Sequence, residues 1–171
     1  DRWSAMGVSV ATAEGQMWGK LVDVVLKLAP IFFLLWLAHE DLGSVFICRG
    51  KLGWSLGIGF LALFNFVATA IAVAASKGGD MATLFADMPW WFAFSLINAF
   101  MEEIWFRGLF LRRLEPAVGV AGALLLTTLA FGTSHLFATY IDLWGTVTFG
   151  IITFTLGMAW ALLMHKTDTL W

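Results

Sequence analysis

Charge interrupts this chain so rarely that several of its stretches are long enough to cross a lipid bilayer. Hydrophobic residues make up 60% of the 171 positions, and charged residues make up 13%. A domain of this length in water cannot bury so much apolar surface in one core. A membrane-spanning helix needs about 17–25 predominantly apolar residues. The stretches that satisfy this length are 21–38, 52–75, 90–115, 118–140 and 143–164.

These stretches predict an all-α protein, a polytopic transmembrane helical bundle with about five membrane-spanning helices. We expect a single integral membrane domain over residues 1–171, with the lipid bilayer as its surroundings. The ten tryptophans fit this habitat, because indole rings favour the membrane interfaces. The net charge is −2 and no basic stripe carries interleaved aromatic residues, so no nucleic-acid partner is expected.

The distribution of lysine and arginine indicates an orientation. With the five spans as assigned, one side of the membrane collects five of these cations and the other collects three. The positive-inside rule then predicts that the loops 40–51 and 112–117 are cytoplasmic. We expect an integral protein of a prokaryotic inner or plasma membrane.

Two ionisable residues lie inside the hairpin formed by the third and fourth expected helices. Glu102 precedes the turn and His135 follows it, while Pro116 and Gly119 mark the turn itself. At 1.5 Å rise per residue, each of the two lies about 24 Å from the turn. The carboxylate and the imidazole are therefore expected at the same depth, with their polar atoms about 3–6 Å apart.

A purely structural explanation fits some of these residues better than others. Glu103 and Arg107 have the spacing and order of an ion pair within one helix, which needs no further function. That explanation does not extend to Glu102, because an unpaired carboxylate in hydrocarbon is costly and such residues usually face a bundle interior or water. His135 taken alone fits a hydrogen-bonded interior histidine. At matched depth, Glu102 and His135 together favour a functional site.

A carboxylate and a neutral imidazole around one water can orient that water and accept its proton, which is general-base hydrolysis. Glu102 and His135 are also possible ligands of a divalent metal such as zinc, although a catalytic zinc normally has three protein ligands. A cofactor therefore stays unassigned, and metal-dependent and metal-free mechanisms both remain open. Ser134 is not expected to be a partner of His135, because neighbouring helical residues point about 100° apart.

Two motifs resemble those of a known family. Residues 102–107 read EEIWFR, which fits the pattern EExxxR, and residues 131–135 read FGTSH, which fits FxxxH. In this order and at this separation, they resemble the CPBP intramembrane protease family, which contains CAAX prenyl endopeptidases and bacteriocin-processing, Abi-like proteins. The stretches RGLFLRRLEPAVG and KTDTLW are similar to the family as well. The CPBP-like core covers about residues 90–171.

The resemblance implies roles for particular residues. Glu102 would be the principal base that activates water, and His135 would assist it. Glu103 and Arg107 would support the site, and Phe131 would shape the pocket. The implied activity is hydrolysis of a peptide bond at the membrane, in a peptide or a prenylated protein. The family is often classed as metalloprotease, in which case Glu102 and His135 would hold the metal, but a metal-free mechanism is also argued.

The chain departs from the family in one respect. A third motif, HxxxN or HxxxD, is absent, because the chain stops at Trp171 where that helix should begin. His165 does not replace it, since position 169 is Thr169. We therefore expect a sequence truncated at its C-terminus and inactive as written. The alternative is a catalytically inactive relative that serves as a structural or accessory subunit of a larger membrane protein complex.

Overall fold

The computed structural model describes residues 11–48, scattered positions between 53 and 76, and residues 78–136 and 143–169. These residues form helices and turns, which confirms the expected all-α class for the described part of the chain. The chain divides into two compact units. The first comprises Asp1–Leu34 and Leu52–Met101, and the second comprises Leu35–Lys51 and Glu102–Trp171.

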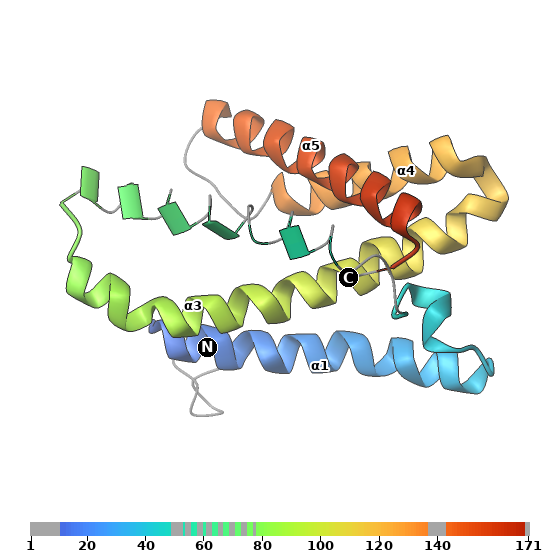
Figure 1. Ribbon diagram of the computed structural model, residues 1–171, viewed down its shortest axis with the longest axis horizontal. Coiled ribbons are helices and arrows are strands. Elements are labelled where there is room, and N and C mark those ends of the chain that lie inside the picture. The colour runs from blue at the N-terminus through green and yellow to red at the C-terminus, as the bar shows by residue number, and fades with distance from the viewer. Residues whose placement is uncertain are drawn as a thin grey trace. The chain divides into compact units, whose positions relative to one another are not determined.

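Figure 1 shows the order of the elements along the chain. Two long helices, α1 and α3, start in the first unit and end in the second, which also holds a 3₁₀ turn η2, a π-helix η3 and the helices α4 and α5. The bounds are α1 Ala13–Leu37, η2 Leu42–Val45, α3 Met81–Glu102, η3 Glu103–Leu111, α4 Arg112–Leu136 and α5 Leu143–Thr167. Most of the second expected span, 52–75, lies outside the described residues.

Among the described residues, two helical stretches are long and apolar enough to cross a membrane, Met81–Leu136 and Leu143–Thr167. The first consists of two limbs, because Gly119 has non-helical backbone angles of φ 71° and ψ 168°. The expected hairpin turn is therefore present at its predicted position. The expected count of about five spans is not confirmed. In α1, Asp23 lies 3.5 Å from Lys20 Nζ and 2.8 Å from Lys27 Nζ, and these charges interrupt its apolar sequence.

The start of α3 differs from the prediction. The sequence indicated a helix from residue 90, directly after Pro89, but α3 begins at Met81 and contains Pro89 in its interior. The reason is Asp80, whose carboxylate accepts hydrogen bonds from the backbone amides of Ala82 at 3.0 Å and Thr83 at 3.3 Å. A carboxylate in this position satisfies amide groups that a helix start otherwise leaves without partners.

The Asp80 cap predicts a pH dependence. The hydroxyl of Thr83, followed by the two backbone amides, lowers the pKa of the Asp80 carboxyl. Because the folded-state pKa lies below the unfolded-state value, the stabilisation is fully present above the unfolded-state pKa and is lost as the pH falls through the folded-state pKa. Hydrogen exchange of the first amides of α3, corrected for intrinsic rates, should show growing loss of protection on acidification.

The matched variant is Asp80→Asn, which keeps a capping oxygen but removes the titrating group. Its first-turn protection should be independent of pH over the same range, whereas Asp87→Asn, beyond the first turn of the same helix, should behave like the wild type. Identical acid profiles for the wild type and Asp80→Asn would contradict the assignment of the cap.

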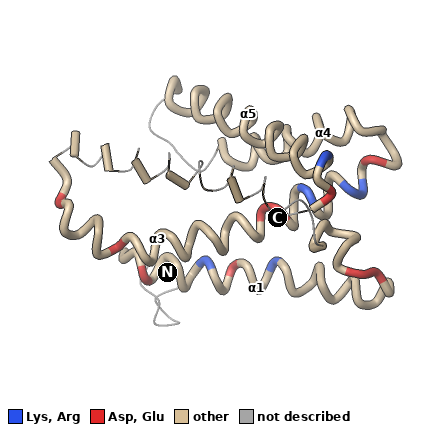
Figure 2. Tube along the Cα trace, viewed as in Figure 1, with Lys and Arg blue, Asp and Glu red and all other residues tan. Residues whose placement is uncertain are grey.

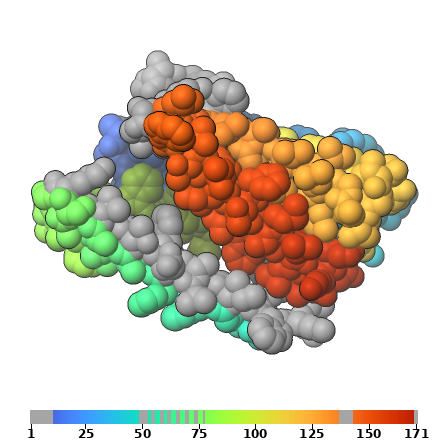
Figure 3. All heavy atoms as spheres, turned by 90° about the horizontal axis from the view of Figure 1, so that it is seen from above, coloured from blue at the N-terminus to red at the C-terminus, as the bar shows by residue number. Residues whose placement is uncertain are grey.

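In the second unit, α4 and α5 lie side by side, and η3 packs against both (Figure 1). In Figure 3, α5 runs along one face from orange to red, with α4 in yellow to orange beside it. The buried hydrophobic cluster draws on the loop after η2, the end of η3, α4 and α5. Its members are Phe46, Leu111, Ala123, Leu124, Ala161 and Met164.

The outward faces of α4 and α5 are suited to a lipid environment. Large apolar side chains such as Leu129, Trp144 and Ile151 are exposed there, and the only lysine or arginine of α5 is Lys166, in its last turn (Figure 2). The exposed hydroxyls of Thr133 and Thr155 donate to carbonyl oxygens of their own helices, at 2.7 Å and 2.8 Å. Such bonds satisfy the hydroxyls without requiring water, as a lipid environment demands.

Ion pairs gather at the end of the second unit where α4 starts and α5 ends. Arg113 pairs with Glu40, Arg112 Nη1 lies 2.7 Å from Asp168 Oδ1, and His165 Nδ1 lies 3.6 Å from Glu115 Oε2. The hydrogen bond from Arg113 lowers the pKa of the Glu40 carboxyl. Charges from the two loops predicted to be cytoplasmic thus meet at one end. Which side of the membrane this end faces stays a prediction.

One close backbone approach fixes η3 against η2. A Cβ atom on Gly108 would lie 2.9 Å from the carbonyl oxygen of Val45 and 3.1 Å from its Cβ. Val45 is fully buried, and a backbone carbonyl cannot swing aside as the tip of a side chain can. Only glycine fits at this position without displacing the turn.

We predict that Gly108→Ala destabilises the second unit by about 1–3 kcal/mol, the usual cost of overpacking. Cys48, the only cysteine of the chain, lies in this unit and donates its thiol hydrogen to the Asp168 carbonyl at 3.0 Å. The temperature at which a maleimide dye labels Cys48 should therefore fall. In the control Gly19→Ala, the added Cβ meets no described atom within 4 Å, so the labelling temperature should not fall.

Candidate functional site

The site begins where α3 passes into the π-helix η3, between Glu102 and Glu103. In a π-helix the backbone hydrogen bonds join residues five apart instead of four, so side chains five apart approach one another along one face. Arg107 is five residues beyond Glu102 and four beyond Glu103. Arg107 Nη1 lies 3.0 Å from Glu103 Oε1.

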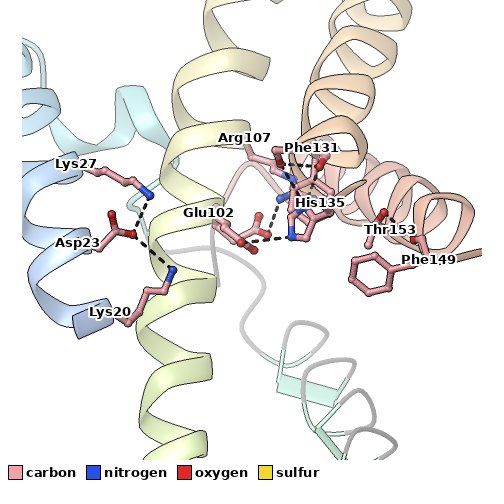
Figure 4. Close-up of polar contacts among 11 residues, drawn as sticks. Lys20, Asp23, Lys27, Glu102, Arg107, Phe131, His135, Phe149 and Thr153 are labelled. Atoms are coloured by element: carbon pink, nitrogen blue, oxygen red, sulfur yellow. Dashed lines mark hydrogen bonds and ion pairs between the residues drawn. The ribbon is translucent and has the colours of Figure 1, made fainter. Parts of the chain in front are cut away.

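Glu102 and His135 face each other, as the sequence predicted. Glu102 Oε1 lies 3.5 Å from His135 Nε2 (Figure 4). Both side chains are largely buried, with exposed fractions of 19% for Glu102 and 21% for His135. The two residues belong to the second unit, one at the end of α3 and the other near the end of α4. The hairpin turn at Gly119 thus brings the pair together at one depth.

The other ring nitrogen determines which tautomer His135 adopts. His135 Nδ1 lies 2.8 Å from the backbone carbonyl oxygen of Phe131. A carbonyl oxygen only accepts, so Nδ1 carries the hydrogen and donates it. In the neutral imidazole Nε2 then has a lone pair, and this lone pair faces the Glu102 carboxylate. Two acceptors at this separation require a proton or a hydrogen-bond donor between them.

The expectation for Ser134 was wrong. Its hydroxyl oxygen lies 3.2 Å from His135 Nδ1, although the two residues are neighbours on one helix. Both side chains fold back toward the same backbone oxygen, because the Ser134 hydroxyl also bonds the Phe131 carbonyl, at 2.7 Å. The angle between Cα–Cβ directions on a helix does not limit contacts made by side chains that converge on a shared carbonyl.

Arg107 is a buried cation with three attachments. Only 1% of its side chain is exposed. Its Nη1 lies 3.0 Å from Glu103 Oε1, its Nη2 donates to the Gly157 carbonyl of α5 at 3.3 Å, and its guanidinium lies over the Phe131 ring at 4.4 Å. Within the described residues, Nη1 and Nε make no directed hydrogen bond. The contact with Glu103 is therefore mainly electrostatic, and the predicted Glu103–Arg107 ion pair is present.

The Phe131 ring contacts both the cation and the imidazole. Its ring centroid lies 4.3 Å from that of His135, and Arg107 lies over the same ring. The ring of Phe106 meets Phe131 edge-on at 5.2 Å, and Phe149 of α5 lies 6.4 Å from the imidazole. Phe131 thus shapes the site with its ring while its carbonyl holds Nδ1. The aromatic rings also limit the access of water from that side.

Sequence reasoning missed three contributors, Ser134, Phe149 and Gly157. A Cβ atom on Gly157 would lie 2.9 Å from a ring carbon of Phe131, so only glycine lets that ring lie so close to α5. A glycine in the interior of an apolar helix was a usable signal, because it costs about 1 kcal/mol relative to alanine. Nothing in the sequence identifies Phe149 among the 16 phenylalanines or places the π-helix.

The residues present do not complete a zinc site. The described residues contain no group of three or more histidine, cysteine, aspartate or glutamate side chains close enough to share a metal ion. Glu102 and His135 alone supply two ligands where a catalytic zinc normally has three.

A helical hairpin with apolar outer faces, long enough to cross a membrane, carries a largely buried carboxylate–imidazole pair. Comparison with protein families matches residues 84–171, just over half of the chain, to type II CAAX prenyl endopeptidase Rce1-like proteins. The chain belongs to this family, which confirms the resemblance drawn from the motifs and indicates a CAAX-type intramembrane protease at the family level. No curated protein and no solved structure matches the chain.

The burial of Arg107 predicts that lysine cannot replace it. Lysine keeps the charge but lacks the planar group that stacks on Phe131 and bonds the Gly157 carbonyl. We expect Arg107→Lys to lose on the order of 2 kcal/mol of stability, as for a hydrogen bond of a charged group. Far-UV circular dichroism during thermal unfolding in detergent measures the loss.

The control is Arg112→Lys. Arg112 is 41% exposed and pairs with Asp168, so its replacement should cost less than about 1 kcal/mol. If both variants lost the same stability, the effect of Arg107→Lys would not depend on the burial of Arg107, and the prediction would be wrong.

Proposed function

We propose that this protein hydrolyses a peptide bond at the membrane with a water activated by Glu102 and His135. The observation that carries the proposal is the 3.5 Å separation of Glu102 Oε1 and His135 Nε2, with Nδ1 already engaged by the Phe131 carbonyl. Membership in the type II CAAX prenyl endopeptidase Rce1-like family supports the same reaction. A prenylated protein or peptide is the proposed substrate.

The pair is suited to hold one water. An ionised carboxylate and an unprotonated Nε2 are both acceptors, and a water molecule has two hydrogens to donate. A water about 2.8 Å from each acceptor completes a triangle on the Glu102–His135 edge. With both hydrogens engaged, its oxygen lone pairs point away from the pair, toward a substrate carbonyl.

The bonds that form and break in the proposed reaction are as follows. The water oxygen bonds to the carbonyl carbon while Glu102 takes one of its hydrogens, and a tetrahedral intermediate forms. The carbon–nitrogen bond breaks, and the leaving nitrogen takes the proton from Glu102. The products are a carboxylic acid and an amine, and the carboxylate of Glu102 is regenerated. His135 accepts a hydrogen bond from the water and fixes the direction of attack.

The neighbouring residues have supporting roles in this proposal. Arg107 neutralises the charge of Glu103, so Glu102 is the one acid of the adjacent pair whose negative charge is not offset in this way. Phe131 packs against both Arg107 and His135 and helps to hold the imidazole in place. The protein would act on substrates that reach the site from the bilayer or its surface.

The test compares Glu102→Gln with Glu115→Gln, each assayed in the full-length protein reconstituted in liposomes. The substrate is a farnesylated peptide that ends in a CAAX sequence, and mass spectrometry identifies the fragments. Glu102→Gln should lower the rate at least about 100-fold, the usual contribution of a general base. His135→Ala should also lower it, because the water loses its second acceptor.

Glu115 provides a matched control, because it pairs with His165 at 3.6 Å, almost the separation of the proposed catalytic pair. Glu115→Gln should keep the wild-type rate. A wild-type rate in Glu102→Gln would refute the mechanism. A folded, inserted wild-type protein that cleaves no prenylated peptide would instead favour the accessory-subunit alternative.

A further inference from the structure

The backbone carbonyl oxygen of Phe131, in α4, accepts hydrogen bonds from two side chains, those of Ser134 and His135. The Phe131 carbonyl accepts from the Ser134 hydroxyl at 2.7 Å and from His135 Nδ1 at 2.8 Å. The Ser134 oxygen also lies 3.2 Å from Nδ1. The three polar atoms form a closed triangle on the side of the imidazole that faces away from Glu102.

We propose that Ser134 is a positioning residue that, with the Phe131 carbonyl, holds His135 in the tautomer with its hydrogen on Nδ1. This inference rests on the proposed function, in which the lone pair on Nε2 accepts a hydrogen bond from the attacking water. Ser134 does not contact that water. It acts through the orientation and the tautomer of His135.

The distances indicate how Ser134 favours this tautomer. The hydroxyl hydrogen goes to the nearer acceptor, the Phe131 carbonyl, so the Ser134 oxygen presents lone pairs to Nδ1. An Nδ1–H group then has two acceptors around it. In the other tautomer, the lone pair of Nδ1 would face the Phe131 oxygen, which is repulsive, and the Ser134 hydroxyl could donate to Nδ1 only by giving up its bond to that oxygen.

A simpler explanation must be separated from this one. Hydroxyls on membrane-exposed helix faces commonly bond their own backbone, and Thr133 does so with the carbonyls of Leu129 and Ala130. Thr133 and Ser134 are adjacent, exposed and back-bonded in the same way. The difference is that the Ser134 oxygen also reaches the imidazole. Thr133 is therefore a matched control for a purely structural role.

The experiment measures the tautomer directly. The full-length protein is labelled with ring-¹⁵N histidine, and His135 is assigned among the three histidines of the chain by the loss of its signals in His135→Gln. Under conditions where the imidazole is neutral, the ¹⁵N shifts should report a protonated Nδ1 and an unprotonated Nε2. Ser134→Ala should shift both toward a tautomer mixture, while Ser134→Thr and Thr133→Ala should keep the wild-type shifts.

Cleavage of the farnesylated peptide gives a second measurement. Ser134→Ala should lower kcat about five-fold, the ratio that one neutral hydrogen bond of about 1 kcal/mol is worth, and leave KM unchanged. Ser134→Thr should restore kcat, and Thr133→Ala should not change it. Wild-type ¹⁵N shifts in Ser134→Ala, or a larger share of the Nδ1–H tautomer, would overturn the proposal.

The two readouts separate this inference from the proposed function. The tautomer is measured without turnover, so it tests Ser134 even if the Glu102 variant remains active. A wild-type rate in Glu102→Gln together with a tautomer shift in Ser134→Ala would reject the proposed mechanism but keep the hydrogen-bond role of Ser134. A loss of activity in Glu102→Gln with an unchanged tautomer in Ser134→Ala would keep the proposed mechanism and reject the role of Ser134.

Discussion

The second unit depends on how a buried guanidinium is accommodated inside an apolar bundle. Arg107 is held by an acid of its own helix, an aromatic ring of α4 and a backbone oxygen of α5. A buried cation is costly unless it is paired with an opposite charge or polar groups. These contacts therefore join η3, α4 and α5 at one point, and they fix the positions from which Glu102 and His135 approach each other.

Much of the hairpin could be predicted from the sequence, because its determinants are local. Gly119 marks a turn, and constant helical rise then places Glu102 and His135 at the same depth. The expected start at residue 90 was wrong because apolar length does not register Asp80, whose side-chain oxygen caps the helix. Loop charges and apolar length could not establish the number of spans. Charged residues such as Lys20, Asp23 and Lys27 in α1 make a helix ambiguous by length and composition.

The parts of the site that escaped prediction are those created by tertiary contacts. Gly157 matters because of where the Phe131 ring lies, and Phe149 matters because α5 faces the imidazole. The π-helix has no signature in residue type, since nine residues of ordinary helical character form it. Ser134 was not expected to contact His135, because adjacent helical side chains point in different directions. That rule does not allow for two side chains that bond the same carbonyl oxygen. Such features follow from the packing of three segments and not from the pattern of any one of them.

Phe131 contributes through its ring and, separately, through its backbone oxygen. Replacing the side chain leaves the oxygen in place, so a substitution survey would register only the contribution of the ring. The contribution of the oxygen could be found by exchanging the peptide linkage after Phe131 for an ester, which weakens the acceptor while keeping every side chain. The backbone oxygen of Phe131 is the same for any side chain at this position, so substitution of the side chain does not test its hydrogen bond to His135.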